Sequence, residues 1–211
     1  MPSNKIEFSK FATPIVPVQK RDGTIRICGD YRSTINTIVK PDSFPVPAAA
    51  VLQAVLAGGR VFSKLDFKDA YQQIVVDEET AEMLIINTHK GLFRVNILPF
   101  GVSCAPGIFQ RRMKSILSKI SGVIVYLDDI LVTGRDEKEH SQRLREVLRS
   151  IQIMGLTLKQ EKCEFKKSSL TFLGCRIDAE GIHPMEEKCE AIKHFPRPKN
   201  KKEFPGTFKF L

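Results

Sequence analysis

The stretch Val123-Ile124-Val125-Tyr126-Leu127-Asp128-Asp129-Ile130-Leu131-Val132 places two adjacent carboxylates inside an otherwise apolar run. Its two short, β-branched halves predict two buried strands joined by a tight turn at the Asp pair. Neighbouring Asp residues in a turn often do no more than bond their own backbone. Here, however, the apolar flanks would desolvate two like charges, which stay ionised only if a cation or strong donors compensate them. A hard divalent ion with oxygen ligands is the simplest compensation.

A third acid, Asp66, ends a strand predicted upstream over residues 61–67. Asp66 lies far from Asp128 in the sequence, so only a folded sheet could bring the two together. Three converging carboxylates suit two Mg²⁺ ions, with Mn²⁺ as a substitute, and an in-line phosphoryl displacement. The order of strands and helices around them predicts an α+β fold with a central antiparallel sheet backed by helices.

The remaining elements follow from hydrophobic periodicity and turn residues. The predicted helices span residues 51–56, 105–119 and 136–154. The predicted strands, besides those above, span residues 14–18, 25–28, 83–88, 92–97, 156–158 and 170–177. Prolines interrupt the 14–18 strand, so we expect it at a sheet edge. Asp69, in the turn after the 61–67 strand, is expected to be a structural turn residue.

Composition narrows the class of protein. The chain has 211 residues, enough for one sizeable domain or one domain plus part of another, and a net charge of +9, which favours a polyanionic partner. Neither a membrane span nor a secretion signal is found, which predicts an intracellular, cytoplasmic protein with no membrane partner. Five scattered cysteines without a CxxC pair predict reduced thiols and no zinc site.

Six motifs occur in an order that gives the sequence a family resemblance. They are Lys20-Arg21-Asp22-Gly23-Thr24-Ile25-Arg26; Asp30-Tyr31-Arg32; Phe62-Ser63-Lys64-Leu65-Asp66 with Ala70-Tyr71-Gln72-Gln73; Leu98-Pro99-Phe100-Gly101 with Ala105-Pro106-Gly107-Ile108-Phe109-Gln110; Tyr126-Leu127-Asp128-Asp129; and Phe172-Leu173-Gly174. From about Phe11 to His183 the sequence resembles the reverse transcriptase of gypsy-type LTR retrotransposons. The resemblance implies a right-hand polymerase fold with fingers and palm, and DNA synthesis on an RNA or DNA template.

The resemblance also implies roles for single residues. Asp66, Asp128 and Asp129 would be the catalytic, metal-binding triad. The incoming deoxynucleoside triphosphate would contact Arg26, either Lys20 or Arg21, Tyr71 beneath the sugar, and Phe100. Template and primer would meet Gly101, Tyr126, Phe172, Leu173 and Gly174. Tyr71 could equally be plain core, and Phe172-Leu173 an ordinary buried strand.

The chain departs from the family pattern in places. Gly29 stands where a β-branched residue is usual, which would soften the fingers hairpin. Residues 1–183 would form the reverse transcriptase domain, with fingers at about 1–60 and 78–105 and palm elsewhere, and residues 184–211 would begin a truncated thumb. The chain is expected to be a fragment of a retrotransposon Pol polyprotein and to act as an RNA-directed DNA polymerase. If the retrotransposon is active, the protein would reside in a virus-like particle. The alternative is a decayed remnant that only binds nucleic acid, and a nucleotide cyclase is a distant third.

Overall fold

The computed structural model describes residues 3–19, 23–40, 42, 44, 49–186 and 189–190. Its strands are β1 (Ser3–Ile6), β2 (Thr13–Gln19), β3 (Ile25–Gly29), β4 (Val61–Asp66), β5 (Ile85–Thr88), β6 (Gly91–Val95), β7 (Val123–Tyr126), β8 (Asp129–Gly134), β9 (Glu164–Lys167), β10 (Leu170–Phe172), β11 (Cys175–Asp178) and β12 (Gly181–Pro184). Its α-helices are α1 (Ala49–Leu56), α2 (Glu78–Met83), α3 (Ala105–Leu117) and α4 (Glu137–Ile153), and short 3-10 helices include η3 (Ala70–Gln73) and η4 (Gln160–Lys162). None of the described helices is long and apolar enough to cross a membrane.

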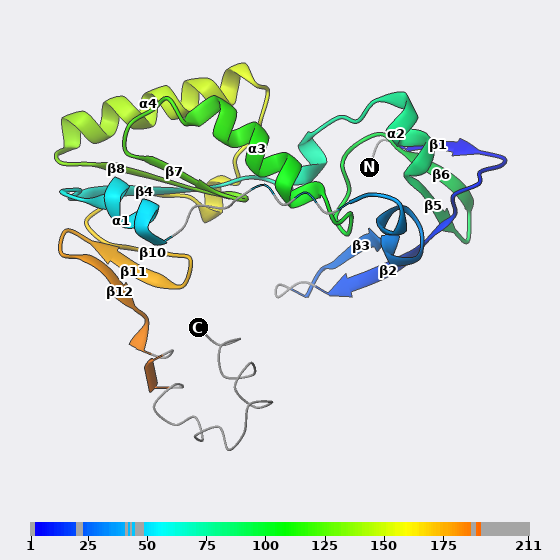
Figure 1. Cartoon of the computed structure of the whole chain (residues 1–211), viewed down its shortest axis with the longest axis horizontal. Helices are drawn as coiled ribbons and strands as arrows, with labels where there is room; N and C mark the ends of the chain where they lie inside the picture. Colours follow the sequence, from blue (N-terminus) through cyan, green and yellow to red (C-terminus); the bar gives the residue numbers. More distant parts are fainter. Residues whose placement is uncertain are drawn as a thin grey trace.

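The central sheet has the strand order β7-β8-β4-β9, and every pair in it is antiparallel. Helices α3 and α4 lie on one face, while α1 and the small sheet β10-β11-β12 lie on the other (Figure 1). The arrangement confirms the predicted antiparallel sheet backed by helices. It also confirms the hairpin in the 123–132 stretch, although the turn itself is Leu127-Asp128 and Asp129 already belongs to β8.

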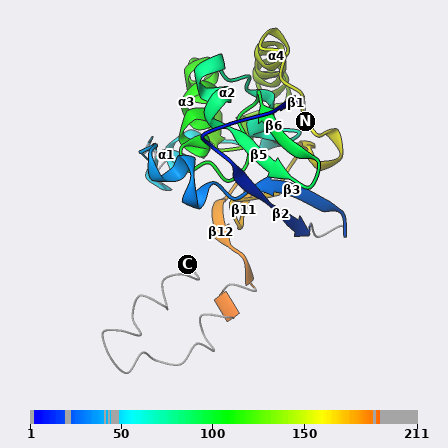
Figure 2. The same cartoon turned by 90° about the vertical axis from the view of Figure 1, so that its right-hand side faces the viewer.

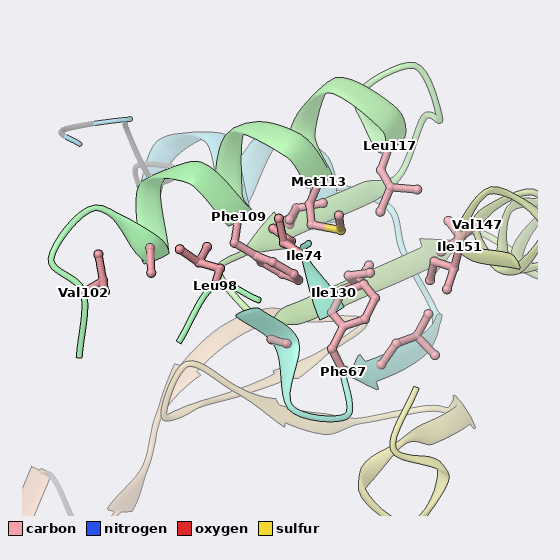
Figure 3. Packing of buried hydrophobic residues seen from close by; sticks show 14 of the residues in the cluster. Phe67, Ile74, Leu98, Val102, Phe109, Met113, Leu117, Ile130, Val147 and Ile151 are labelled. Carbon is pink, nitrogen blue, oxygen red and sulfur yellow. The ribbon is translucent and has the colours of Figure 1, made fainter. Parts of the chain in front are cut away.

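Alternating side chains of β8 bury themselves in two separate cores. Ile130 and Val132 join a large cluster beneath α3 and α4, to which Phe67 and Phe109 also belong (Figure 3). Leu131 points the other way, into a smaller cluster formed with α1 and the small sheet. Because successive strand residues face opposite sides, the continuous apolar run of β8 is what a sheet covered on both faces requires.

The N-terminal sheet has the order β1-β6-β5-β2-β3 and faces the viewer in Figure 2. The prediction that residues 14–18 form an edge strand is confirmed for residues 15–18, although the start of β2 lies between β5 and β3. Pairing with β5 is parallel and covers only Thr13 and Pro14. Beyond Pro14 only β3 runs beside β2, so Pro17 deprives no strand on that side of a hydrogen bond.

Two strand predictions need correction. Residues 156–158 form no strand, and only a single bridge joins Leu158 to Phe67. Residues 170–177 are two strands, β10 and β11, because the chain turns back at Leu173-Gly174 with φ of 52° and 72°. Positive φ at both central residues makes a tight hairpin turn, and a leucine gives no sequence signal for one.

Three short strands, β1, β9 and β12, and one short α-helix, α2, were not predicted. Helix α2 has six residues and is capped by Asp77, whose side chain accepts a hydrogen bond from the Thr80 backbone N–H at 2.7 Å. The predicted helices over 51–56, 105–119 and 136–154 are confirmed within two residues at each end, and Asp136 caps α4. Most of the predicted thumb segment, 184–211, lies outside the described residues.

Candidate active site

Two of the three aspartates face each other at one end of the central sheet. Asp66 is the last residue of β4 and pairs with Asp129, the first residue of β8. Asp128 occupies the turn immediately before it. Asp66 and Asp128 both line a cleft of about 620 Å³ between the central sheet and the β2–β3 hairpin. The structure therefore brings together the three acids that the sequence singled out.

The turn that carries Asp128 is held by Gln110 of α3. The Gln110 amide donates to the Val125 carbonyl at 2.9 Å and accepts from the Leu127 N–H at 2.5 Å. Gln110 is fully buried, and Leu127 has a φ of 52°, which L-residues disfavour. Sequence reasoning missed this role, because a polar residue on a helix gives no indication of which backbone it will meet.

The backbone of Asp66 is anchored on the side of β4 that faces away from β8. Its carbonyl accepts from the Lys159 N–H at 2.8 Å, and its N–H donates to the Cys163 sulfur at 3.5 Å. Lys159 and Lys162 also line the cleft. The segment around η4 therefore both fixes Asp66 and brings positive charge to the site, another contribution that was not predicted.

The carboxylates repel one another, and lysines compensate them only in part. Burial raises the pKa of Asp66, with the charges of Asp129 and Asp128 adding to the effect and Lys162 opposing it. Burial likewise raises the pKa of Asp129, which Lys64 opposes. The Lys162 Nζ lies 3.9 Å from Asp66 Oδ2, and the Lys64 Nζ lies 3.4 Å from Asp129 Oδ1. Additional positive charge would stabilise the ionised carboxylates.

A divalent cation fits this environment, since partly buried carboxylate oxygens in need of positive charge are the ligands that Mg²⁺ prefers. Within the part of the chain that the structure describes, the one set of three ligand atoms lying within 4.8 Å of one another belongs to Asp178, Glu180 and His183 at the β11–β12 turn. The aspartates of the cleft stand further apart as a set. One ion could not bind all three where they stand.

Of the predicted nucleotide contacts, Arg26 and Phe100 line the cleft, and Tyr71 packs against Phe100. The Arg26 guanidinium lies 4.3 Å from the centre of the Phe100 ring, and both residues line the cleft. The Tyr71 ring packs on Phe100 and on Phe109, with centroids 5.3 Å and 5.6 Å apart. Burial raises the pKa of Tyr71, and the negative charge of Asp128 adds to this. Lys20 and Arg21 lie outside the described residues.

The predicted template and primer residues are more dispersed. Gly101 has a φ of 98°, and a Cβ there would lie 2.8 Å from the Gly29 carbonyl oxygen, so only glycine fits. Tyr126 pairs with Asp129 across the hairpin. Phe172 is 1% exposed and lies in the smaller core. Leu173 and Gly174 form the β10–β11 turn.

Comparisons with known proteins agree with this arrangement. The sequence model of the family described as "Reverse transcriptase (RNA-dependent DNA polymerase)" matches residues 18–177. An uncharacterised protein of Caenorhabditis elegans is 37% identical over 200 residues, and the Transposon Tf2-3 polyprotein of Schizosaccharomyces pombe is 36% identical over 205. These matches cover 94% and 95% of this chain but only 16% and 15% of the relatives, so the chain spans a small part of their length.

A solved structure has the same fold. The foamy viral protease-reverse transcriptase in complex with double-stranded DNA superposes with a TM-score of 0.84 at 24% identity, covering 99% of this chain and 36% of that one. The likeness confirms the predicted α+β right-hand fold.

Proposed function

Because the chain belongs to the reverse transcriptase (RNA-dependent DNA polymerase) family, we propose that it extends a primer 3′-hydroxyl with deoxynucleoside triphosphates on an RNA or DNA template. The observation that carries this proposal is the meeting of Asp66 and Asp128 with Arg26 and Phe100 around one cleft. Carboxylates on one wall and a cation above an aromatic ring on the other suit a triphosphate whose reacting end lies toward the acids.

Asp66, Asp128 and Asp129 would hold two Mg²⁺ ions, for which Mn²⁺ could substitute. When bound, such ions lower the pKa of the attacking hydroxyl and neutralise charge on the departing pyrophosphate. Lys64 would keep Asp129 in place through the ion pair already present. Two ions, rather than one, suit carboxylates that are spread along the end of a sheet.

Arg26 would bind the triphosphate while its contact with Phe100 keeps the guanidinium over the cleft. We propose that Lys20 or Arg21, a few residues before Arg26 in the sequence, assists it. Tyr71 would lie under the sugar and exclude a 2′-hydroxyl by steric clash. Gly101 would allow close approach of the template. Tyr126, Phe172, Leu173 and Gly174 are proposed to support the primer end, Phe172 from within the core.

The DNA-bound foamy viral structure supports a nucleic-acid duplex as the partner. We propose that the N-terminal sheet forms the fingers and the central sheet the palm. Helix α1 packs in the smaller core with Phe62 and Ile124 of the central sheet, so we assign it to the palm.

Primer extension with Mg²⁺ tests the proposal. Asp128→Asn is nearly isosteric and removes one charge, so it should abolish synthesis while leaving primer–template binding, followed by fluorescence anisotropy, unchanged or tighter. Glu180→Gln is the matched control, since it removes one exposed charge from the Asp178, Glu180 and His183 group. If synthesis survives in Asp128→Asn but is lost in Glu180→Gln, the essential metal is bound by the Asp178, Glu180 and His183 group and not by Asp128. Binding without synthesis by the unaltered chain would favour a nucleic-acid-binding remnant.

A further inference from the structure

The side chain of Gln73, the last residue of η3, crosses to a segment distant in the sequence. Its Nε2 donates to the Lys68 carbonyl at 2.6 Å and to the Thr157 carbonyl at 3.0 Å. Its Oε1 accepts from the Thr157 N–H at 2.6 Å. A primary amide that satisfies both its donor and its acceptor on fixed backbone groups is held in one orientation.

The segment that Gln73 reaches is the one that anchors Asp66. The Lys68 N–H donates to the Thr157 carbonyl at 3.0 Å, and the Lys159 N–H donates to the Asp66 carbonyl at 2.8 Å. The chain therefore closes a ring of hydrogen bonds, from Asp66 through the turn to Gln73, across to Thr157, and back through Lys159 to Asp66.

Tyr71 lies inside this ring, two residues before Gln73. Its ring packs on Phe100 and Phe109 at the edge of the large core. The backbone beneath it passes through Asp69, whose φ of 48° is in the left-handed region. Such a turn tends to relax unless its surroundings hold it. The Gln73 amide holds the C-terminal end of this turn through its hydrogen bonds to Thr157.

We propose that Gln73 is a specificity-determining positioning residue. It fixes the position of Tyr71 relative to Asp66 and so determines how strongly ribonucleotides are excluded. The inference rests on the proposed function, in which Tyr71 clashes with a 2′-hydroxyl. A steric filter works through small distances, so a turn that shifts by a fraction of an ångström admits the larger sugar. Gln73 itself touches neither nucleotide nor primer.

The test compares deoxyribonucleotides with ribonucleotides, using kcat/KM for each in single-nucleotide primer extension. The ratio of the two values does not depend on the fraction of active enzyme, so a variant that is only less stable leaves it unchanged. Gln73→Ala should lower the ratio by on the order of tenfold. Gln73→Glu, which keeps the acceptor but sets a carboxylate against two carbonyls, should lower it at least as much. It also provides a second variant if Gln73→Ala does not fold.

Two further variants separate the possible outcomes. Gln72→Ala is the matched control, because the hydrogen bonds to Lys68 and Thr157 come from the side chain of Gln73 and not from that of Gln72, and the unaltered ratio is expected for it. Tyr71→Val is the reference for a lost filter. A lowered ratio in Tyr71→Val with no change in both Gln73 variants overturns the role of Gln73 and leaves the Tyr71 assignment standing. An unchanged ratio in Tyr71→Val overturns the filter itself, and the role of Gln73 with it.

Discussion

Replacing Gln110 by methionine tests how the turn that carries Asp128 is held. The change keeps the length of the side chain but removes the donor to Val125 and the acceptor for Leu127. Both backbone groups then lose a partner where water enters poorly, at about 1–3 kcal/mol for each such group. Because the Leu127 end is only partly buried, we expect a total loss of about 2–4 kcal/mol in the free energy of unfolding.

A loss of that size should leave the variant folded under native conditions and can be measured by denaturation. Domains of this size lose about 2–4 °C of Tm per kcal/mol, so Tm should fall by roughly 5–15 °C. Urea denaturation at 25 °C, followed by circular dichroism, gives the free energy directly. Gln142→Met is the matched control, since Gln142 is exposed on α4 and bonds only to Glu146 at 3.3 Å. Its effect should stay within about 0.5 kcal/mol.

Primer extension should fall further in Gln110→Met than the folded fraction does. Leu127 is held at a φ that costs about 1–2 kcal/mol, so the freed turn would relax and move Asp128 away from Asp66. If Gln110→Met and Gln142→Met unfold at the same urea concentration and extend primers equally, the turn does not depend on Gln110.

Three further outcomes are expected. His140 is fully buried, and neither ring nitrogen has a hydrogen-bond partner within the described residues. Burial lowers the pKa of His140, so the unfolded chain takes up a proton before the folded protein does, and stability should decline as pH falls below about 6.5. Urea midpoints at pH 7 and pH 5 should show a smaller decline in His140→Leu. Gly29→Val would place a Cβ 2.6 Å from the buried Tyr31 ring and should cost about 1–3 kcal/mol in urea denaturation, a penalty that shrinks when Tyr31→Leu is combined with it. Anisotropy titrations at several salt concentrations should show primer–template affinity falling steeply with salt, and less steeply by about one unit of logarithmic slope for each of Lys159→Gln and Lys162→Gln that removes a phosphate contact.

Much of the fold could be predicted because its signals are local. The 105–119 and 136–154 helices carry apolar residues at helical spacing, one strand ends at Asp66, and Asp128 lies in the turn between two others. Pairing two such strands leaves little freedom about where the carboxylates meet. Gly29 is an instructive case, because its lack of a Cβ leaves room for the Tyr31 ring, which the sequence alone could not show.

The features that were not predicted depend on which segment a residue meets after folding and not on the type of the residue itself. Leu173 turns the chain at a positive φ although leucine is no turn former, because β10 and β11 are held in their register. Gln73 and Gln110 look like ordinary polar residues until folding sets Thr157 beside one and Leu127 beside the other. Contacts of this kind are made between segments far apart in the chain, and no local pattern records them.

The double covering of the central sheet has a consequence for hydrogen exchange. Strands β4 and β8 have neighbours on both sides and packed layers above and below, so their amides should open to solvent only in events close to global unfolding. Asp66 and Asp129 stand at the outermost pair of this slow-exchanging ladder. Deuterium uptake should therefore rise sharply from Ile130 back to Asp128, and any motion of the three aspartates would be confined to the end of an otherwise rigid sheet.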